Sequence, residues 1–184
     1  MNFGTWARTG RRTLVVVAAA ATLVTGAGMA TASATPVQVG PISATPADSI
    51  KPWLPSSPLP SNFTLRTDRP SLDDLNKVVY FLVATGASDQ AKAANVEGGM
   101  SSVIVPRTVY TLGLFRAPLG WNRVTGPLVQ NGDHVTATLN SGSAGRPTIR
   151  MTIAFKRING NWALASSSMC EGVKTVGLRI YCNS

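Results

Sequence analysis

After Pro70, apolar residues first recur three and four positions apart, the spacing of one helix face: Leu72, Leu75, Val78, Val79, Leu82 and Val83. Ser71 and Asp74 stand three residues apart, as in a capping box. Asp73 and Asp74 fall in the first turn, where the helix dipole favours acidic side chains. Gly86 is the expected C-terminal cap. This pattern predicts a helix over residues 71–85.

Further along, the apolar period changes from helical to two. Val135, Ala137 and Leu139 alternate with threonines, and the same alternation covers 149–156 and resumes at 162–164. Asn159-Gly160 is a strong hairpin signal, and Asn131-Gly132 marks another turn. These strands predict an antiparallel meander with one apolar and one polar face. Because the apolar face must be buried, and the preceding helix can cover it, the fold class is predicted to be α+β.

The region between the helix and the strands gives a weaker signal. Residues 87–99 are interpreted as a loop or a short helix. In residues 101–115, β-branched side chains favour a strand, whereas Ser101 or Ser102 could cap a helix with Pro106 in an early turn. Pro106 argues against a central strand in either case. Both alternatives stay open at this stage.

The N-terminus has the three parts of an export signal. Arg8, Arg11 and Arg12 precede an apolar run over 14–21, and Ala32-Ser33-Ala34 provides small residues for a signal peptidase. We therefore predict that residues 1–34 are a signal peptide, cut between Ala34 and Thr35. An uncleaved anchor is disfavoured, because a membrane span needs about 20 strongly apolar residues. The Arg11-Arg12 pair also resembles a twin-arginine signal, so the export route stays open.

Residues 35–70 are rich in proline, serine, threonine and alanine, and eight prolines interrupt them. This composition predicts an extended, mobile linker, with Trp53-Leu54 as an apolar pair that could dock on the domain or on a partner. Residues 71–184 are then expected to form a single domain. The predicted location is outside the cell or in the cell wall, without a stable membrane anchor after cleavage.

Charge and cysteine content refine this picture. The chain contains seventeen Lys and Arg and eight Asp and Glu, which gives a formal net charge of +9. The basic residues are scattered, whereas nucleic-acid binding normally needs a clustered basic face, so no nucleic-acid partner is expected. The excess charge provides solubility or a weak, salt-sensitive attraction to anionic envelope material. Cys170 and Cys182 are the only cysteines, and in an exported chain their even number predicts a structural disulfide.

In this order along the chain, these features resemble the C-terminal domain of the mycobacterial low-molecular-weight secreted antigen family. The resemblance covers residues 71–173 and includes the motifs Val96-Glu97-Gly98-Gly99 and Gly160-Asn161-Trp162-Ala163-Leu164-Ala165-Ser166. It implies an exported actinobacterial protein of unknown molecular function. The implied fold is similar to cystatin-like or nuclear-transport-factor-2-like domains, in which a curved sheet wraps around helices. The family supplies no catalytic residues, and the tail with both cysteines departs from its pattern.

No complete catalytic, cofactor or metal motif is present. His134 is interpreted as a solvated turn residue, because no nucleophile motif such as G-x-S-x-G accompanies it. Glu97 is either a carboxylate at a pocket mouth or, as we favour, part of a tight turn with the two glycines that follow. If the curved sheet encloses an apolar pocket, its candidate lining residues are Tyr110, Trp121, Met151, Phe155 and Trp162.

The leading hypothesis is therefore a non-enzymatic exported protein whose domain binds another protein or an envelope component. The alternative is a carrier of a small apolar ligand or lipid, which a sizeable, partly polar cavity would favour and a tightly filled interior would exclude. A third hypothesis is an enzyme with an acidic residue in that pocket, which requires a buried Asp or Glu opposite a Tyr.

Overall fold

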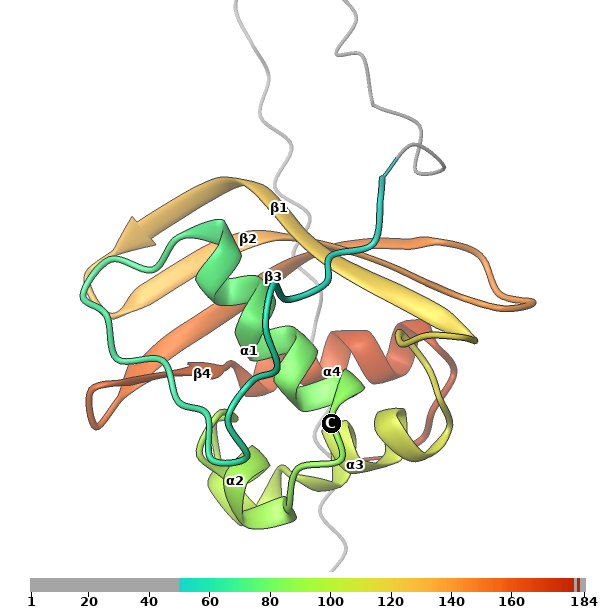
Figure 1. Ribbon diagram of the computed structural model, residues 1–184, viewed down its shortest axis with the longest axis horizontal. Coiled ribbons are helices and arrows are strands. Elements are labelled where there is room, and N and C mark those ends of the chain that lie inside the picture. The colour runs from blue at the N-terminus through green and yellow to red at the C-terminus, as the bar shows by residue number, and fades with distance from the viewer. Residues whose placement is uncertain (1–49, 181, 183–184) are drawn as a thin grey trace, which may run out of the picture. The chain divides into compact units, whose positions relative to one another are not determined.

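The computed structural model describes residues 50–180 and 182 (Figure 1). The predicted signal peptide, its cut between Ala34 and Thr35, and residues 35–49 lie outside the described residues. The elements, in chain order, are α1 (Leu72–Ala84), α2 (Asp89–Ala93), a 3-10 turn (Gly99–Ser101), α3 (Ile104–Thr111), β1 (Gly120–Asn131), β2 (His134–Ser143), β3 (Ile149–Ile158), β4 (Asn161–Leu164) and α4 (Ser166–Thr175). Among the described residues, none of the helices combines the length and the apolar composition of a membrane span.

The first helix begins where the sequence predicts. The Ser71 hydroxyl accepts a hydrogen bond from the Asp74 backbone, and the Asp74 carboxylate accepts one from the Ser71 backbone, which completes the capping box. The predicted range ends correctly at Thr85, but the prediction of Gly86 as the cap was wrong. Thr85 is the C-cap, in extended conformation, and Gly86 has no positive φ. A side chain at Gly86 would instead meet the Tyr110 hydroxyl 3.1 Å from its Cβ, so this glycine permits a close approach.

The ambiguous region after Gly99 is helical. A 3-10 turn leads into α3, and Pro106 stands in the first turn of this helix, where its missing N–H costs nothing. Neither Ser101 nor Ser102 caps α3. The N-cap is Val103, without a side-chain hydrogen bond. The upstream segment contains the short helix α2, whose first turn is capped by the Ser88 hydroxyl.

The strands form one antiparallel meander in the order β1-β2-β3-β4. The β3–β4 hairpin turns at Asn159 and Gly160, both with positive φ, as the Asn-Gly pair predicts. The first strand, β1, was not predicted. It pairs with β2 through an irregularity between Thr125 and Val129, and the intervening Gly126 and Pro127 hide its alternation.

Helices cover one face of this sheet, and we call that face the inner face (Figure 1). The arrangement confirms the α+β class. Every second residue of each strand points to the inner face. The largest fully buried side chains of the sheet lie on this face. The main members of the core are Leu75, Val78 and Leu82 from α1, Val135, Ile153, Phe155 and Trp162 from the sheet, and Met169 and Val173 from α4.

Residues 50–70, here called the strap, lie against the domain. The Trp53 indole donates to the Asp73 carboxylate at 3.0 Å, and its ring packs edge-on against Tyr80. Further along, the backbone of Leu65 accepts from the Trp162 N–H at 2.8 Å. This part of the expected linker therefore belongs to the folded unit, which differs from the expectation of a mobile segment up to Pro70.

The edges of the sheet are also covered. On β1, the Asn122 carbonyl accepts from the Trp53 N–H of the strap. The Asn76 side chain of α1 accepts from the Val124 N–H at 2.7 Å and donates to the Val124 carbonyl at 2.8 Å. On β4, Leu65 of the strap bonds to the opposite edge. These contacts satisfy backbone groups that would otherwise invite pairing with another chain.

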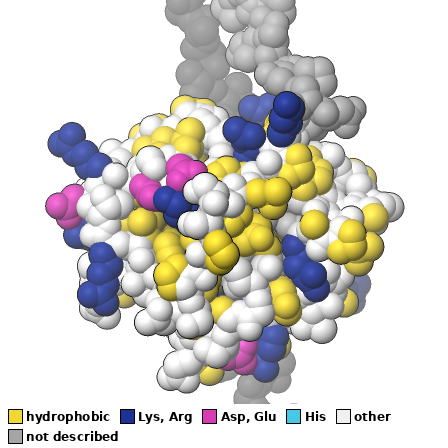
Figure 2. Space-filling model, in the orientation of Figure 1, with side chains coloured by type: hydrophobic (Ala, Val, Ile, Leu, Met, Phe, Trp, Pro, Cys, Tyr) yellow, Lys and Arg dark blue, Asp and Glu magenta, His cyan; other side chains and the backbone are white. Residues whose placement is uncertain are grey.

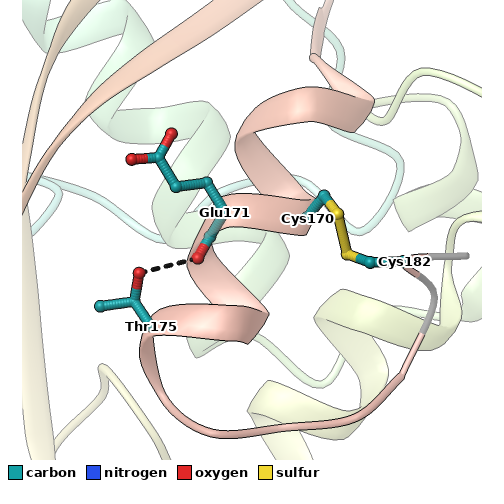
Figure 3. The surroundings of a disulfide bond; sticks show 4 residues. All are labelled: Cys170, Glu171, Thr175 and Cys182. Atoms are coloured by element: carbon teal, nitrogen blue, oxygen red, sulfur yellow. Dashed lines mark hydrogen bonds between the residues drawn. A yellow bond between two sulfur atoms is a disulfide. The ribbon is translucent and has the colours of Figure 1, made fainter. Parts of the chain in front are cut away.

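The C-terminal segment is held by the predicted disulfide, which the structure confirms. Cys170 of α4 is bonded to Cys182, and their Cα atoms lie 5.4 Å apart (Figure 3). The helix that carries Cys170 was not predicted, because Ser166–Ser168 and Gly172 interrupt its apolar pattern. The disulfide bond ties the segment that follows α4 back to this helix.

We expect Asn76→Ala to lower the free energy of unfolding by about 3 kcal/mol, because it leaves the buried N–H and C=O of Val124 without partners. Urea unfolding followed by tryptophan fluorescence measures the loss. Asn62→Ala is the matched control, since Asn62 is exposed, and it should change stability by less than about 0.5 kcal/mol. Equal effects of the two substitutions would contradict a role for Asn76 in joining α1 to β1.

Candidate functional site

A cavity of about 70 Å³ lies between the inner face of the sheet and helices α1, α3 and α4. Its walls are apolar with two exceptions, Asn122 and Ser168. The other lining residues are Val79 and Val83 of α1, Val105 and Val109 of α3, Phe115, Leu139, Met151, Ile153 and Leu164, and Met169, Gly172, Val173 and Val176 of α4. The half-buried members, such as Val83 and Leu164, show where the cavity approaches the surface.

Asn122 is the unusual member of this lining. It lies on the inner face of β1 and is 3% exposed. Its side-chain N–H donates to the Phe115 carbonyl at 2.8 Å, but its Oδ1 has no hydrogen-bond partner among the protein atoms of the described residues. A buried acceptor without a partner costs about 1–3 kcal/mol. The cavity therefore combines an apolar wall with one unsatisfied acceptor.

The other polar lining residue is already satisfied. The Ser168 hydroxyl of α4 accepts from the Ala154 N–H of β3 at 2.8 Å, which fixes the helix against the sheet. One turn later, Gly172 faces the cavity. A Cβ added there would find its nearest neighbour, the Met151 sulfur, at 4.0 Å, so an alanine would fit. Alanine is about 1 kcal/mol better than glycine inside a helix, so glycine here keeps space open at a cost in stability.

The dimensions limit what the cavity accepts. An apolar cavity of about 150 Å³ holds one benzene, so this cavity of about 70 Å³ encloses about half of such a ring, and the rest of a ligand of that size would lie toward the surface near Val83 and Leu164. No ionisable side chain lines it, so the lining offers no general acid or base. In addition, no Asp or Glu of the described residues is buried, and the half-buried ones, Asp74, Asp89 and Glu97, are held in a helix cap or in ion pairs.

The structure brings only one of the five proposed lining residues to this cavity, Met151 of β3. Phe155 and Trp162 are fully buried in the core beneath the sheet, where the Trp162 indole donates to the Thr67 carbonyl of the strap. Trp121 lies on the outer face, with its ring over Gly142 of β2. Side-chain size alone did not separate residues that fill space from residues that border it.

Tyr110, the fifth proposed residue, organises a cationic cluster instead. The Lys92 ammonium lies 4.4 Å from the centre of its ring, and the Arg116 guanidinium lies 4.5 Å from it. Lys92 is 2% exposed, and burial lowers the pKa of its amine to about 8, with Arg116 adding to the shift and Asp89 opposing it. This buried lysine was not predicted, because α2 is short and carries no apolar periodicity.

Glu97 has a structural role, as favoured from the sequence, but its carboxylate acts as a helix cap and ion-pair partner, which the expected turn with the two glycines did not include. Its carboxylate accepts from the Lys156 ammonium at 2.5 Å and from the Ser166 N–H at 2.8 Å. Ser166 is the first residue of α4, whose own N-cap, Ala165, has no side-chain oxygen to offer. Lys156 lowers the pKa of the Glu97 carboxyl most, Ser166 adds to this effect, and burial opposes it. Glu97 therefore caps α4 from a distant loop.

The remaining candidates take no part in the cavity. His134 is exposed at the start of β2, beside the turn through Gly132. Within residues 50–180 and 182, no group of three or more His, Cys, Asp or Glu side chains is placed to hold a metal ion.

We expect Glu97→Gln to destabilise the protein by about 1 kcal/mol at pH 7, the usual effect of losing a helix cap. Because the pKa of Glu97 is lowered by folding, its contribution is present above the unfolded pKa and is lost as pH falls through the folded pKa. The stability gap between wild type and Glu97→Gln should therefore close below about pH 4. Urea unfolding from pH 7 to pH 3 tests this, with exposed Glu171→Gln as control; a pH-independent gap would contradict it.

Of two comparisons with known proteins, the one with protein families places the chain. No curated protein matches it. The family model of the low molecular weight antigen MTB12, C-terminal domain, matches residues 68–179, which include every helix and strand described above. The matched range also contains every residue that lines the cavity, so the cavity is built entirely within the family domain. The chain belongs to the low molecular weight antigen MTB12 family and contains its C-terminal domain.

Proposed function

We propose that this protein is an exported, non-catalytic binding domain that holds a small, mainly apolar ligand in the cavity above the inner face of the sheet. The ligand carries one hydrogen-bond donor, which pairs with Oδ1 of Asn122. The single observation that carries the proposal is this buried, unpartnered acceptor in an otherwise apolar lining. Pockets for small molecules typically combine apolar walls with a few such orienting polar groups.

The chemistry of the lining specifies the class of ligand. An amide oxygen accepts a hydrogen bond, so it favours a hydroxyl over an ether, a ketone or a carboxylate. A charged group is excluded, because no opposite charge lines the cavity to compensate its desolvation. A small alcohol or phenol meets both conditions, as does the hydroxyl-bearing end of a larger apolar molecule.

Export is supported by three independent features. The N-terminal sequence has the order of a signal peptide, the Cys170–Cys182 disulfide suits an oxidising compartment, and the family is one of antigens. The proposal favours a small ligand over a protein partner for the inner face, because the cavity lies beneath a helical layer. A protein or envelope partner for other surfaces is compatible with it.

Phenol and toluene provide a matched test, because they have the same shape and differ by a hydroxyl in place of a methyl group. We expect phenol to perturb the amide resonances around the cavity in a ¹⁵N-labelled NMR titration. In Asn122→Leu, the ratio of phenol to toluene affinity should fall about tenfold, the value of one hydrogen bond to a buried acceptor.

Asn122→Leu also removes the bond to Phe115, so a second variant guards against a folding defect. Gly172→Val fills the cavity from α4 without touching Asn122, and it should weaken binding of both compounds. An unchanged phenol-to-toluene ratio in folded Asn122→Leu would contradict the role of Asn122. Resonance changes confined to surface residues would contradict the cavity as the site.

A further inference from the structure

A second recessed site lies on the outer face of the sheet, opposite the cavity. It is a groove of about 490 Å³ lined by Ile50, Lys51, Arg123, Thr125, Gly126, Asn140 and Arg150. We infer that this groove binds the phosphate ester of a polyol. The phosphate would lie between the basic side chains, and a hydroxyl of the polyol would pair with Asn140. The inference is independent of the ligand proposed for the cavity.

Strand register builds the site. Arg123 of β1 is paired with Asn140 of β2, which is paired with Arg150 of β3. The three residues therefore form one row across neighbouring strands, on the same face of the sheet. Since adjacent strands lie about 4.8 Å apart, the two arginine Cα atoms are separated by about 10 Å. Two side chains as long as arginine can converge on one anion across this distance, directly above Asn140.

The positive charge of the groove is not neutralised by the protein. Residues 50–182 contain fourteen Lys and Arg and seven Asp and Glu. Five of these acids are already paired with other bases: Asp68, Asp73, Asp74, Asp89 and Glu97. In the described part of the chain, no carboxylate forms an ion pair with Lys51, Arg123 or Arg150. In Figure 2 basic side chains are dispersed over the visible face of the domain, and some of them lie at its upper edge.

The guanidinium groups suit phosphate in particular. Arginine presents a planar fork of donors that bonds two phosphate oxygens at once, and it stays charged at every physiological pH. In this structure Arg123 donates one hydrogen bond, from its Nη1 to the Lys51 carbonyl at 3.1 Å. Arg150 is exposed. Both therefore have donors left for a ligand.

Asn140 indicates that the ligand is more than a bare anion. It is 1% exposed, and its side-chain N–H donates to the Thr125 hydroxyl at 2.9 Å. Its Oδ1 has no partner among the protein atoms of the described residues. An acceptor cannot pair with a phosphate oxygen, but it pairs with a hydroxyl. The groove volume is also several times that of a phosphate, which leaves room for a group of sugar size.

Soluble phosphate esters test the site directly. We expect glycerol 3-phosphate to bind the purified protein at low ionic strength and to bind more tightly than propyl phosphate, which lacks the hydroxyls. Arg150→Gln should weaken binding about tenfold, the effect of losing a charged hydrogen bond. Arg69→Gln is the matched control, because Arg69 is exposed outside the groove and the substitution changes the net charge equally. Isothermal titration calorimetry measures each affinity.

Equal losses in Arg150→Gln and Arg69→Gln would overturn the site, because general charge would then explain the binding. Equal affinities for the two esters would overturn the role of Asn140. Neither result bears on the cavity, whose probes are uncharged.

Vesicles distinguish the source of the ligand. Cosedimentation with phosphatidylcholine vesicles, with and without phosphatidylglycerol, presents the same glycerol phosphate group on a membrane. Arg150-dependent binding to phosphatidylglycerol vesicles would identify a lipid headgroup, and Arg150-dependent binding of the soluble ester alone would identify a free phosphate ester. Absence of both at low ionic strength, where charge attraction is least screened, would overturn the inference.

Discussion

The two open edges of a four-stranded sheet are the constraint on which this fold depends. The Asn76 side chain closes one edge by pairing with both backbone groups of Val124, and so it also sets α1 over β1. The strap completes the closure at Trp53, and at the other edge Leu65 bonds to β4. The same contacts therefore protect the sheet from pairing with other chains and decide where the helical layer sits.

The position of α1 in turn creates the cavity. Three helices from separate parts of the chain converge on a narrow sheet, and Gly172 of α4 leaves the space between them unfilled where an alanine would fit. Asn122 then places one acceptor in that apolar space. The loss of stability at both positions is the kind of local cost that accompanies binding sites. A binding role for the cavity would explain why apolar side chains do not fill this part of the interior.

Strand alternation gives the sheet two faces with different chemistry. Asn122 points to the inner, apolar cavity, and its neighbour Arg123 points to the outer, basic groove. Each site contains a buried asparagine whose side-chain oxygen has no partner among the described protein atoms, but only the groove also has positive charge. Adjacent residues of one strand, β1, thus contribute to the uncharged cavity and to the groove proposed to bind an anionic ligand.

Local signals explain what the sequence could predict. The capping box of Ser71 and the alternation of β2 and β3 lie within short windows, so α1 and most of the sheet were identified. The strand β1 was missed because Gly126 and Pro127 interrupt it, and α4 because small polar residues and Gly172 dilute its apolar face. The sequence also identified Cys170–Cys182, whose pairing needs no register.

Both sites depend on long-range register, which no local pattern contains. Arg123 and Arg150 are 27 positions apart in the sequence and meet only because each pairs with Asn140. The proposed aromatic lining was chosen by size, and large aromatic side chains fill the core better than they border a cavity. An isolated polar residue among apolar ones, such as Asn122 beside Trp121 and Val124, is a more useful signal once a strand is recognised.

A crystal structure of the protein soaked in phenol tests the central claim most directly. The account predicts one phenol between α1, α4 and the inner face of the sheet, with its oxygen within about 3 Å of Oδ1 of Asn122. A cavity without phenol at saturating concentration, or a phenol whose hydroxyl points away from Asn122, would contradict it.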